Sequence, residues 1–331
     1  MIDLELSWKQ AAIAAAAVAV ASAALRISGA RPGGHPPDAP AETRRRRLVS
    51  VSVFGQETGL ILGLFALWQY AGSFGFAGPG GALARARWIW HAERVLHLPS
   101  ETALQHVFLP HPLIIQFFNF YYLSLHFAVL IITMIWLFAW HRPDYRRLRT
   151  TLALFTGACL IIQFIPVAPP RMLPSTGLVD TAILYHQSVY GSVAGFEADQ
   201  LSAMPSVHVG WAILVAVAVI GSARTRWRWL ILLYPALTTL VVVVTANHFW
   251  ADGIVAAALL GLVLLIQSAA RSLVRRLLVR VRHRPIPGLY PERPAWDDLG
   301  TQDHVGLGEH DGTIGADAEL SRTSARRDRP A

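Results

Sequence analysis

One stretch of the chain decides the fold, residues 204–252: MPSVHVGWAILVAVAVIGSARTRWRWLILLYPALTTLVVVVTANHFWAD. Its two apolar runs, Val209–Ile220 and Leu230–Thr245, are separated by a short arginine-rich turn. As helices, each run rises on the order of 20 Å, so the second returns the chain to the membrane face where the first began. His208 and His248 flank this hairpin. We expect their imidazoles to meet at that face.

A carboxylate accompanies the second histidine. Asp252 follows His248 by four residues, which places both side chains on one helical face, within reach of a carboxylate–imidazole hydrogen bond. Such a pair is typical of nucleophilic and acid–base sites. Ionisable side chains at membrane depth are costly and usually functional. His208, His248 and Asp252 are therefore candidate catalytic residues.

The composition indicates a membrane protein. Of the 331 residues, 53% are hydrophobic and only 15% are charged, and several apolar runs approach the ~20 residues that a membrane crossing needs. We expect seven spans: Ala11–Leu25, Val51–Tyr70, Leu113–Trp140, Thr151–Val167, Val207–Ile220, Leu230–Thr245 and Trp250–Ala269. The predicted fold class is all-α, a polytopic bundle of about six or seven transmembrane helices.

The first span has a second interpretation, because it is short and rich in small residues like a signal peptide. Cleavage after it would leave the run Arg44–Arg47 outside the cell, against the alternation of the later loops. We therefore expect this span to remain as a membrane helix.

Arginine placement predicts the orientation. Arginines cluster after alternate spans, within residues 26–47, 142–149, 224–228 and 271–284. By the positive-inside rule these loops are cytoplasmic, which places the candidate catalytic residues on the extracytoplasmic face of the cell membrane. Most of the net charge of +8 comes from the arginines of these loops, which also suit anionic lipid headgroups. No stacked aromatic–basic pattern favours nucleic acid as a partner.

Three regions are expected along the chain. Residues 1–49 form an N-terminal membrane helix and a basic cytoplasmic loop, and residues 50–284 form the catalytic membrane domain. Residues 285–331 are polar and lack apolar periodicity, which is typical of a disordered cytoplasmic tail. The lone cysteine, Cys159, allows no intrachain disulfide.

Two residues are candidate phosphate ligands. Arg171 follows a proline-rich segment on the same face as the histidines, and its planar guanidinium suits a pair of phosphoryl oxygens. The alternative is an interfacial arginine that extends toward lipid headgroups. Ser206 precedes a helix start, where its hydroxyl and the free N–H groups can bind an anion. Ser206 equally suits a simple helix N-cap, and the two roles are compatible.

These motifs resemble a known family. The segments Pro205-Ser206-Val207-His208 and His248-Phe249-Trp250-Ala251-Asp252 resemble the P-S-x-H and H-x-x-x-D signatures of the type 2 phosphatidic acid phosphatase (PAP2) superfamily. The Pro-Pro-Arg segment ending at Arg171 and the run Phe118–His126 resemble its inositol phosphorylceramide synthase branch, which contains inositolphosphotransferases. The resemblance covers roughly Glu93–Gly261 and implies a PAP2-like helical core.

The chain departs from the phosphatase pattern at two positions. Phe164 stands where the first phosphatase signature has a lysine, seven residues before its arginine. Val242 stands where the third has an arginine, six residues before its histidine. A site with fewer cations holds its phosphate less strongly, and this departure resembles the lipid phosphotransferase branch.

The resemblance implies phosphoryl or phosphodiester transfer through a phosphohistidine. His248, oriented by Asp252, attacks phosphorus, and His208 protonates the leaving alkoxide and later accepts a proton from the incoming hydroxyl. Arg171 and Ser206 neutralise charge on the equatorial oxygens. The substrate is a membrane lipid, and the acceptor is a lipid, a polyol or water. No cofactor is expected, and no metal, because the sequence offers no ligand set for one.

Four further residues, on the third span and near the first outer loop, are weighed as site residues. The resemblance implies that His126 lines the substrate site, with Tyr122 one turn away on the same helical face; a histidine hydrogen-bonded between helices is the alternative. Trp88–Leu98 is expected to form an amphipathic interfacial helix. Glu93 on that segment and Glu101, one or two turns further on, are expected to form a solvated face rather than a site.

Three functions remain open from the sequence. The first is a lipid phosphotransferase, and the second is a phosphatase of lipid phosphates or prenyl diphosphates that uses the same residues. The third is a transporter or scaffold without catalytic activity. The third is disfavoured because the spans show no inverted repeat and the polar residues gather at one face instead of lining a path across the membrane.

Overall fold

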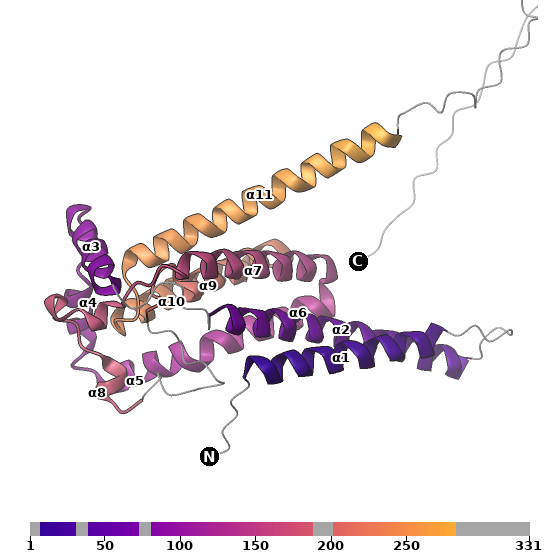
Figure 1. Ribbon diagram of the computed structural model, residues 1–331, viewed down its shortest axis with the longest axis horizontal. Coiled ribbons are helices and arrows are strands. Elements are labelled where there is room, and N and C mark those ends of the chain that lie inside the picture. The colour runs from indigo at the N-terminus through magenta and orange to yellow at the C-terminus, as the bar shows by residue number, and fades with distance from the viewer. Residues whose placement is uncertain (1–6, 31–38, 73–80, 188–200, 283–331) are drawn as a thin grey trace, which may run out of the picture. The chain divides into compact units, whose positions relative to one another are not determined.

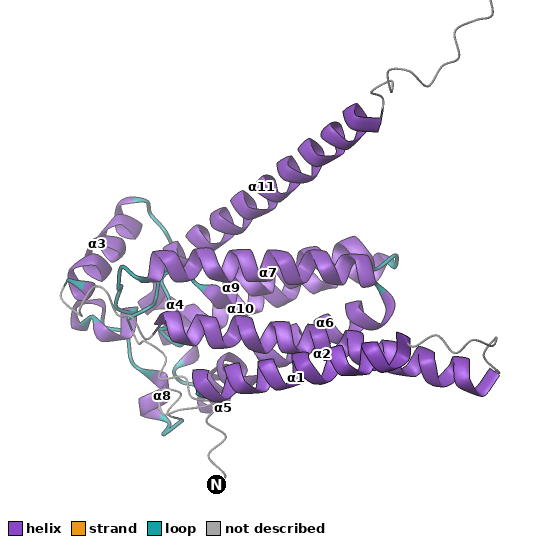
Figure 2. Ribbon diagram, turned by 45° about the vertical axis from the view of Figure 1, so that its right-hand side comes forward, coloured by secondary structure: helices purple, strands orange, loops and turns teal. Residues whose placement is uncertain are grey.

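The computed structural model describes residues 7–30, 39–72, 81–187 and 201–282. In these ranges every regular element is helical, and one isolated bridge pairs Val167 with Ser202 (Figures 1 and 2). The longer helices are α1 (Trp8–Ala30), α2 (Ala39–Gly72), α3 (Ala82–Val95), α4 (Glu101–Phe108), α5 (Pro112–Phe120), α6 (His126–Trp140), α7 (Arg142–Gln163), α9 (Val207–Ser222), α10 (Leu233–Val244) and α11 (Trp250–Arg282). The predicted all-α fold is confirmed.

Short helical turns connect these elements. They are η1 (Tyr121–Leu125), η2 (Pro170–Met172), η3 (Pro174–Thr176), α8 (Thr181–Leu184) and η4 (Arg226–Leu232). The chain divides into two compact units, Met1–Val274 and Arg275–Ala331, and all the candidate site residues belong to the first. The expected tail, 285–331, lies outside the described residues.

The protein is a multi-pass membrane protein by the length and hydropathy of its helices. Five described segments are long and apolar enough to cross a membrane: Trp8–Ser28, Glu42–Leu67, Pro112–Trp140, Arg226–Val244 and Trp250–Val279. Helix α9 is a shorter apolar helix. The expected span Thr151–Val167 is not among the five, because it falls in α7, whose first half is rich in arginine and which ends at Gln163.

Small residues allow α1 and α2 to form a close hairpin. Gly55, Gly59 and Gly63 recur every fourth residue on α2, and a Cβ atom at Gly59 would lie only 3.1 Å from the carbonyl oxygen of Ala15. Small residues at this spacing let two membrane helices approach until their backbones touch. The first apolar span is thus packed as a helix against the second.

The histidine hairpin is present as α9 and α10, joined by the 3₁₀ turn η4 and packed side by side (Figure 2). Helix α7 packs closely against the start of α9, where a Cβ atom at Gly210 would lie 2.0 Å from the ring of Phe155. Glycine at position 210 therefore lets the first turn of α9, which carries His208, sit directly on α7.

The third span changes from α-helical to π-helical hydrogen bonding near its middle. Helices α5 and α6 are continuous through the π-helical turn Tyr121–Leu125. Single π-turns inside α-helices occur frequently at functional sites. This turn carries Tyr122, and His126 follows it at the first position of α6.

Candidate functional site

The structure brings the two hairpin histidines together. His208 lies in the first turn of α9, and His248 lies in the turn between α10 and α11. Their ring centroids are 6.0 Å apart. The two helical legs therefore return the chain to one place, as their matched lengths require.

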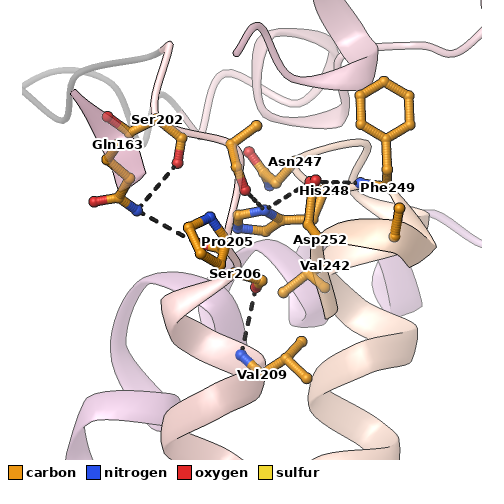
Figure 3. A network of polar contacts seen from close by, with 12 residues as sticks. Gln163, Ser202, Pro205, Ser206, Val209, Val242, Asn247, His248, Phe249 and Asp252 are labelled. Atoms are coloured by element: carbon orange, nitrogen blue, oxygen red, sulfur yellow. Dashed lines mark hydrogen bonds and ion pairs between the residues drawn. The ribbon is translucent and has the colours of Figure 1, made fainter. Parts of the chain in front are cut away.

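The geometry around His248 defines its tautomer (Figure 3). Its Nδ1 lies 2.7 Å from the carbonyl oxygen of Ala203 and 3.3 Å from Oδ2 of Asp252. Because a carbonyl oxygen can only accept a hydrogen bond, Nδ1 carries a hydrogen, and the lone pair of the neutral ring is therefore on Nε2. Asp252 is fully buried and is itself held by the backbone N–H of Phe249, which donates to Oδ2 at 2.9 Å.

The loop before α9 places the Ala203 carbonyl. Val167 bonds to the residues on either side of its bridge partner Ser202: its N–H donates to the carbonyl of Leu201 at 2.6 Å, and its carbonyl accepts from the N–H of Ala203 at 3.1 Å. From the end of α7, the side-chain amide of Gln163 donates to the carbonyls of Ser202 and Pro205 (Figure 3). These bonds fix the extended segment that faces His248.

Ser206 is the N-cap of α9 and links the two ends of the hairpin. Its hydroxyl oxygen accepts from the N–H of Val209 at 3.4 Å, and its own N–H donates to the carbonyl of Asp252 at 3.1 Å. N-caps of this kind stabilise a helix by about 1 kcal/mol. The capping contact uses a lone pair of the hydroxyl, so its hydrogen stays available for an acceptor such as a phosphate oxygen.

Arg171 is held beside the turn that carries His248. Its Nη1 donates to Oδ1 of Asn247 at 2.6 Å, its Nε pairs with Oδ2 of Asp180 at 3.3 Å, and its backbone N–H donates to the carbonyl of Ala246. The side chain is only 6% exposed. An arginine that extends toward headgroups would be exposed, so the structure contradicts that alternative.

Tyr122 and His126 contact His208 from the third span. The Tyr122 ring stacks on the His208 imidazole with centroids 4.3 Å apart, and the His126 ring lies 5.0 Å from it. His126 is fully buried, and its Nδ1 lies 2.9 Å from the hydroxyl of Tyr234 on α10. Its Nε2 has no hydrogen-bond partner among the described residues. His126 therefore bridges helices, as the alternative interpretation expected, and it borders His208; its contact with substrate stays a prediction.

The expectation of a solvated face at Glu93 and Glu101 is wrong. Both side chains are 1% exposed. The amphipathic helix is present as α3, but its buried face consists of Ala82, Ala86, Ile89 and Glu93, so Glu93 points inward. Exposed Trp88 lies on the opposite side.

Four groups that hold the site residues in place were not predicted from the sequence. Asn247, Asp180 and Tyr234 hold Arg171 and His126, and the Ala203 carbonyl holds His248. Asn247 adjoins His248 in sequence, which is a usable signal. Asp180 and Tyr234 are brought in by folding alone. Among the described residues, no three His, Cys, Asp or Glu side chains converge as a metal site would require.

Comparison with known proteins identifies the family. The family model described as the PAP2 superfamily matches residues 87–266, more than half of the chain. The matched range runs from α3 into α11 and includes every residue of the site described above. No curated protein and no solved structure matches the chain. With its paired histidines and its Asp252 at one end of a helical hairpin, the chain belongs to the PAP2 superfamily.

Proposed function

We propose that this protein is a membrane-embedded lipid phosphotransferase that works through a phosphohistidine at His248. The observation that carries the proposal is the hydrogen bond from His248 Nδ1 to the Ala203 carbonyl. It fixes the hydrogen on Nδ1, so that the lone pair of the neutral ring is on Nε2, the attacking nitrogen. The carboxylate of Asp252, 3.3 Å from the same Nδ1, stabilises the positive charge that the ring acquires on attack.

The reaction needs two steps. In the first, Nε2 of His248 forms a bond to phosphorus while the P–O bond to the leaving group breaks, and His208 donates a proton to the departing alkoxide. In the second, the incoming hydroxyl gives its proton to His208 and attacks phosphorus, and the P–N bond breaks. The two imidazole centroids are 6.0 Å apart, so the proton donor adjoins the nucleophile.

Two groups are placed to stabilise the negative charge that develops on the phosphoryl oxygens. Arg171 is fixed by Asn247 and Asp180, and a guanidinium held in place stabilises developing negative charge without reorganising during the reaction. The hydroxyl of Ser206, at the N-terminus of α9, supplies a second donor where the helix dipole also favours an anion.

Transfer to an alcohol is favoured over hydrolysis by the two missing cations. Val242 is 2% exposed, and its carbonyl accepts the backbone N–H groups of Asn247 and His248. A buried apolar side chain therefore stands at this position, where the phosphatase pattern has an arginine. A less cationic site suits a phosphodiester, which carries less charge than a phosphomonoester, as expected for the inositolphosphotransferase branch that the sequence resembles.

The fate of phosphorus tests this proposal. The purified protein in lipid nanodiscs is offered ³²P-labelled phosphatidylinositol or phosphatidic acid, with ceramide and glycerol as acceptors. The expected result is labelled phosphate or phosphoinositol on an acceptor hydroxyl, detected by chromatography and mass spectrometry. Release of inorganic phosphate alone, in every combination of donor and acceptor, would establish the phosphatase function instead.

The extracytoplasmic placement of the site has a separate test. Single cysteines at Leu96, in the turn after α3, and at Thr225, between α9 and α10, are both at exposed positions. A membrane-impermeant thiol reagent on intact cells is expected to label the first and spare the second, because the arginine-rich turns are cytoplasmic. Native Cys159 is buried and provides an unlabelled background. The reverse labelling pattern would invert the proposed topology.

A further inference from the structure

The N-terminus of α11, which carries the catalytic carboxylate, is capped by a residue of another helix. Phe249 occupies the N-cap position and has no side-chain acceptor for the free N–H groups of the first turn. Asp252, at the third helical position, reaches back to the N–H of Phe249 at 2.9 Å, as the second residue of a capping box does. The N–H of Ala251 instead donates to Oε1 of Glu93, on α3, at 2.6 Å.

Glu93 belongs to a buried cluster between α3 and α4. Glu93 and Glu101 are each 1% exposed, and Arg94 donates to Oε2 of Glu101 at 2.7 Å. Arg94 also donates to the carbonyl of Pro99, which accepts a further bond from the indole of Trp250. The cluster therefore joins α3, α4 and the first turn of α11.

One carboxyl oxygen of each glutamate lacks a hydrogen-bond donor unless one of the two carboxyl groups is protonated. Oε2 of Glu93 and Oε1 of Glu101 receive no N–H or O–H bond from any other described residue, and the two carboxyl groups contact each other. Two buried carboxylates in contact satisfy these oxygens only by sharing a proton. One arginine then balances one carboxylate, and the cluster carries no net charge.

The surroundings favour this protonated form. Burial, first of all, raises the pKa of Glu93 to about 9, helped by its hydrogen bond with Glu101 and by the negative charges of Glu101 and Asp252. The N–H of Ala251 opposes the shift. The charged groups around Glu93 are therefore Glu101 on α4, Arg94 on its own helix α3, and Asp252 on α11.

We propose that Glu93 is a positioning residue whose protonated carboxyl, shared with Glu101, caps α11 and holds the turn that carries His248 and Asp252. The neutral carboxyl accepts from Ala251 with Oε1 and donates to Glu101 with Oε2. Ionised Glu93 would lose the bond to Glu101 and place a charge near Asp252. The inference rests on the proposed function for its effect on activity, but the shared proton is independent of it.

The sign of the pH effect follows from the raised pKa. Glu93 holds its proton in the folded protein at pH values where it would be ionised in the unfolded chain. The stabilisation is therefore complete below the ordinary glutamate pKa and is lost as pH rises toward about 9. Activity is expected to fall in an alkaline limb as the capping arrangement opens.

Infrared spectroscopy tests the shared proton without any substrate. The protein in nanodiscs is expected to show the carbonyl stretching band of a protonated carboxylic acid at neutral pH, lost on titration through about pH 9. Glu93→Gln is expected to lack this band. Asp144→Asn, at a surface pair with Arg147 on α7, serves as the control and is expected to retain it. A wild-type spectrum without the band at pH 7 would overturn the proposal whatever the enzyme does.

The pH–rate profile tests the positioning role. Glutamine keeps both contacts, accepting from Ala251 and donating to Glu101, so Glu93→Gln is expected to retain activity near pH 7 and to lose the alkaline limb. Glu93→Ala is expected to lower kcat about 10–100-fold with little change in KM, the scale of a displaced catalytic group. An unchanged alkaline limb in Glu93→Gln would contradict the proposal. Inactivity of the wild type toward every donor would instead contradict the proposed function and leave the infrared result standing.

Discussion

His248→Asn is expected to lose turnover completely and to form no covalent intermediate. In the proposed first step Nε2 of His248 forms the bond to phosphorus, so its removal abolishes that step. Removal of a nucleophile typically lowers kcat on the order of 10⁶-fold. The measurement is acid-labile, base-stable ³²P on the protein after rapid quenching with labelled phosphatidic acid or phosphatidylinositol, together with steady-state turnover.

Asp252→Asn is the graded control for this experiment. The Ala203 carbonyl, 2.7 Å from Nδ1, keeps the correct tautomer of His248 without Asp252. The variant is therefore expected to form the same phosphohistidine more slowly, and to lose less activity than the ~10⁴-fold seen where an aspartate alone sets the tautomer. Labelled protein from His248→Asn, in amounts equal to the wild type, would place the nucleophile elsewhere.

The histidine pair could be predicted from sequence because only two quantities decide it. A helix has a fixed rise per residue, and the two apolar legs between His208 and His248 have similar lengths. Any hairpin built from them returns the second histidine to the level of the first. The spacing of His248 and Asp252 depends likewise on a single helical period.

The contacts that orient these residues could not be predicted, because they depend on tertiary structure. Every residue has a carbonyl, and that of Ala203 faces His248 only because Val167 holds the loop across an isolated bridge. Asp180, just before α8, reaches back to Arg171 in η2. No sequence pattern distinguishes such groups from their neighbours.

The burial of Glu93 was missed although a signal was present. Ala82, Ala86, Ile89 and Glu93 recur at spacings of three and four, which is the pattern of one buried helical face. The charge of glutamate argued against including Glu93 in that face. Its burial is possible because Glu101 and the free N–H of Ala251, in the first turn of α11, give the carboxyl partners. The fourth expected span, Thr151–Val167, coincides with the apolar second half of α7 as far as Gln163.

His208→Ala is expected to lose about 10²–10⁴-fold in activity with alkoxide leaving groups, the usual contribution of general acid–base catalysis. The His208 ring centroid lies 6.0 Å from that of His248, and the His208 ring stacks on Tyr122. Its proton is needed only when the leaving oxygen is strongly basic. An activated aryl phosphodiester, whose phenolate leaves unprotonated, is therefore expected to restore burst formation of the phosphohistidine in His208→Ala.

The rescue separates the two histidines because they act on different bonds. His248→Asn gains nothing from a better leaving group, since it lacks the nucleophile. Tyr122→Phe is the matched control, because it keeps the ring stacked on His208 and is expected to respond to both leaving groups like the wild type. Rescue of His248→Asn in place of His208→Ala would reverse the two assignments. In His208→Ala the second step still lacks the base that activates the acceptor hydroxyl, so the burst is expected to be followed by slow turnover, with phosphorus held on His248.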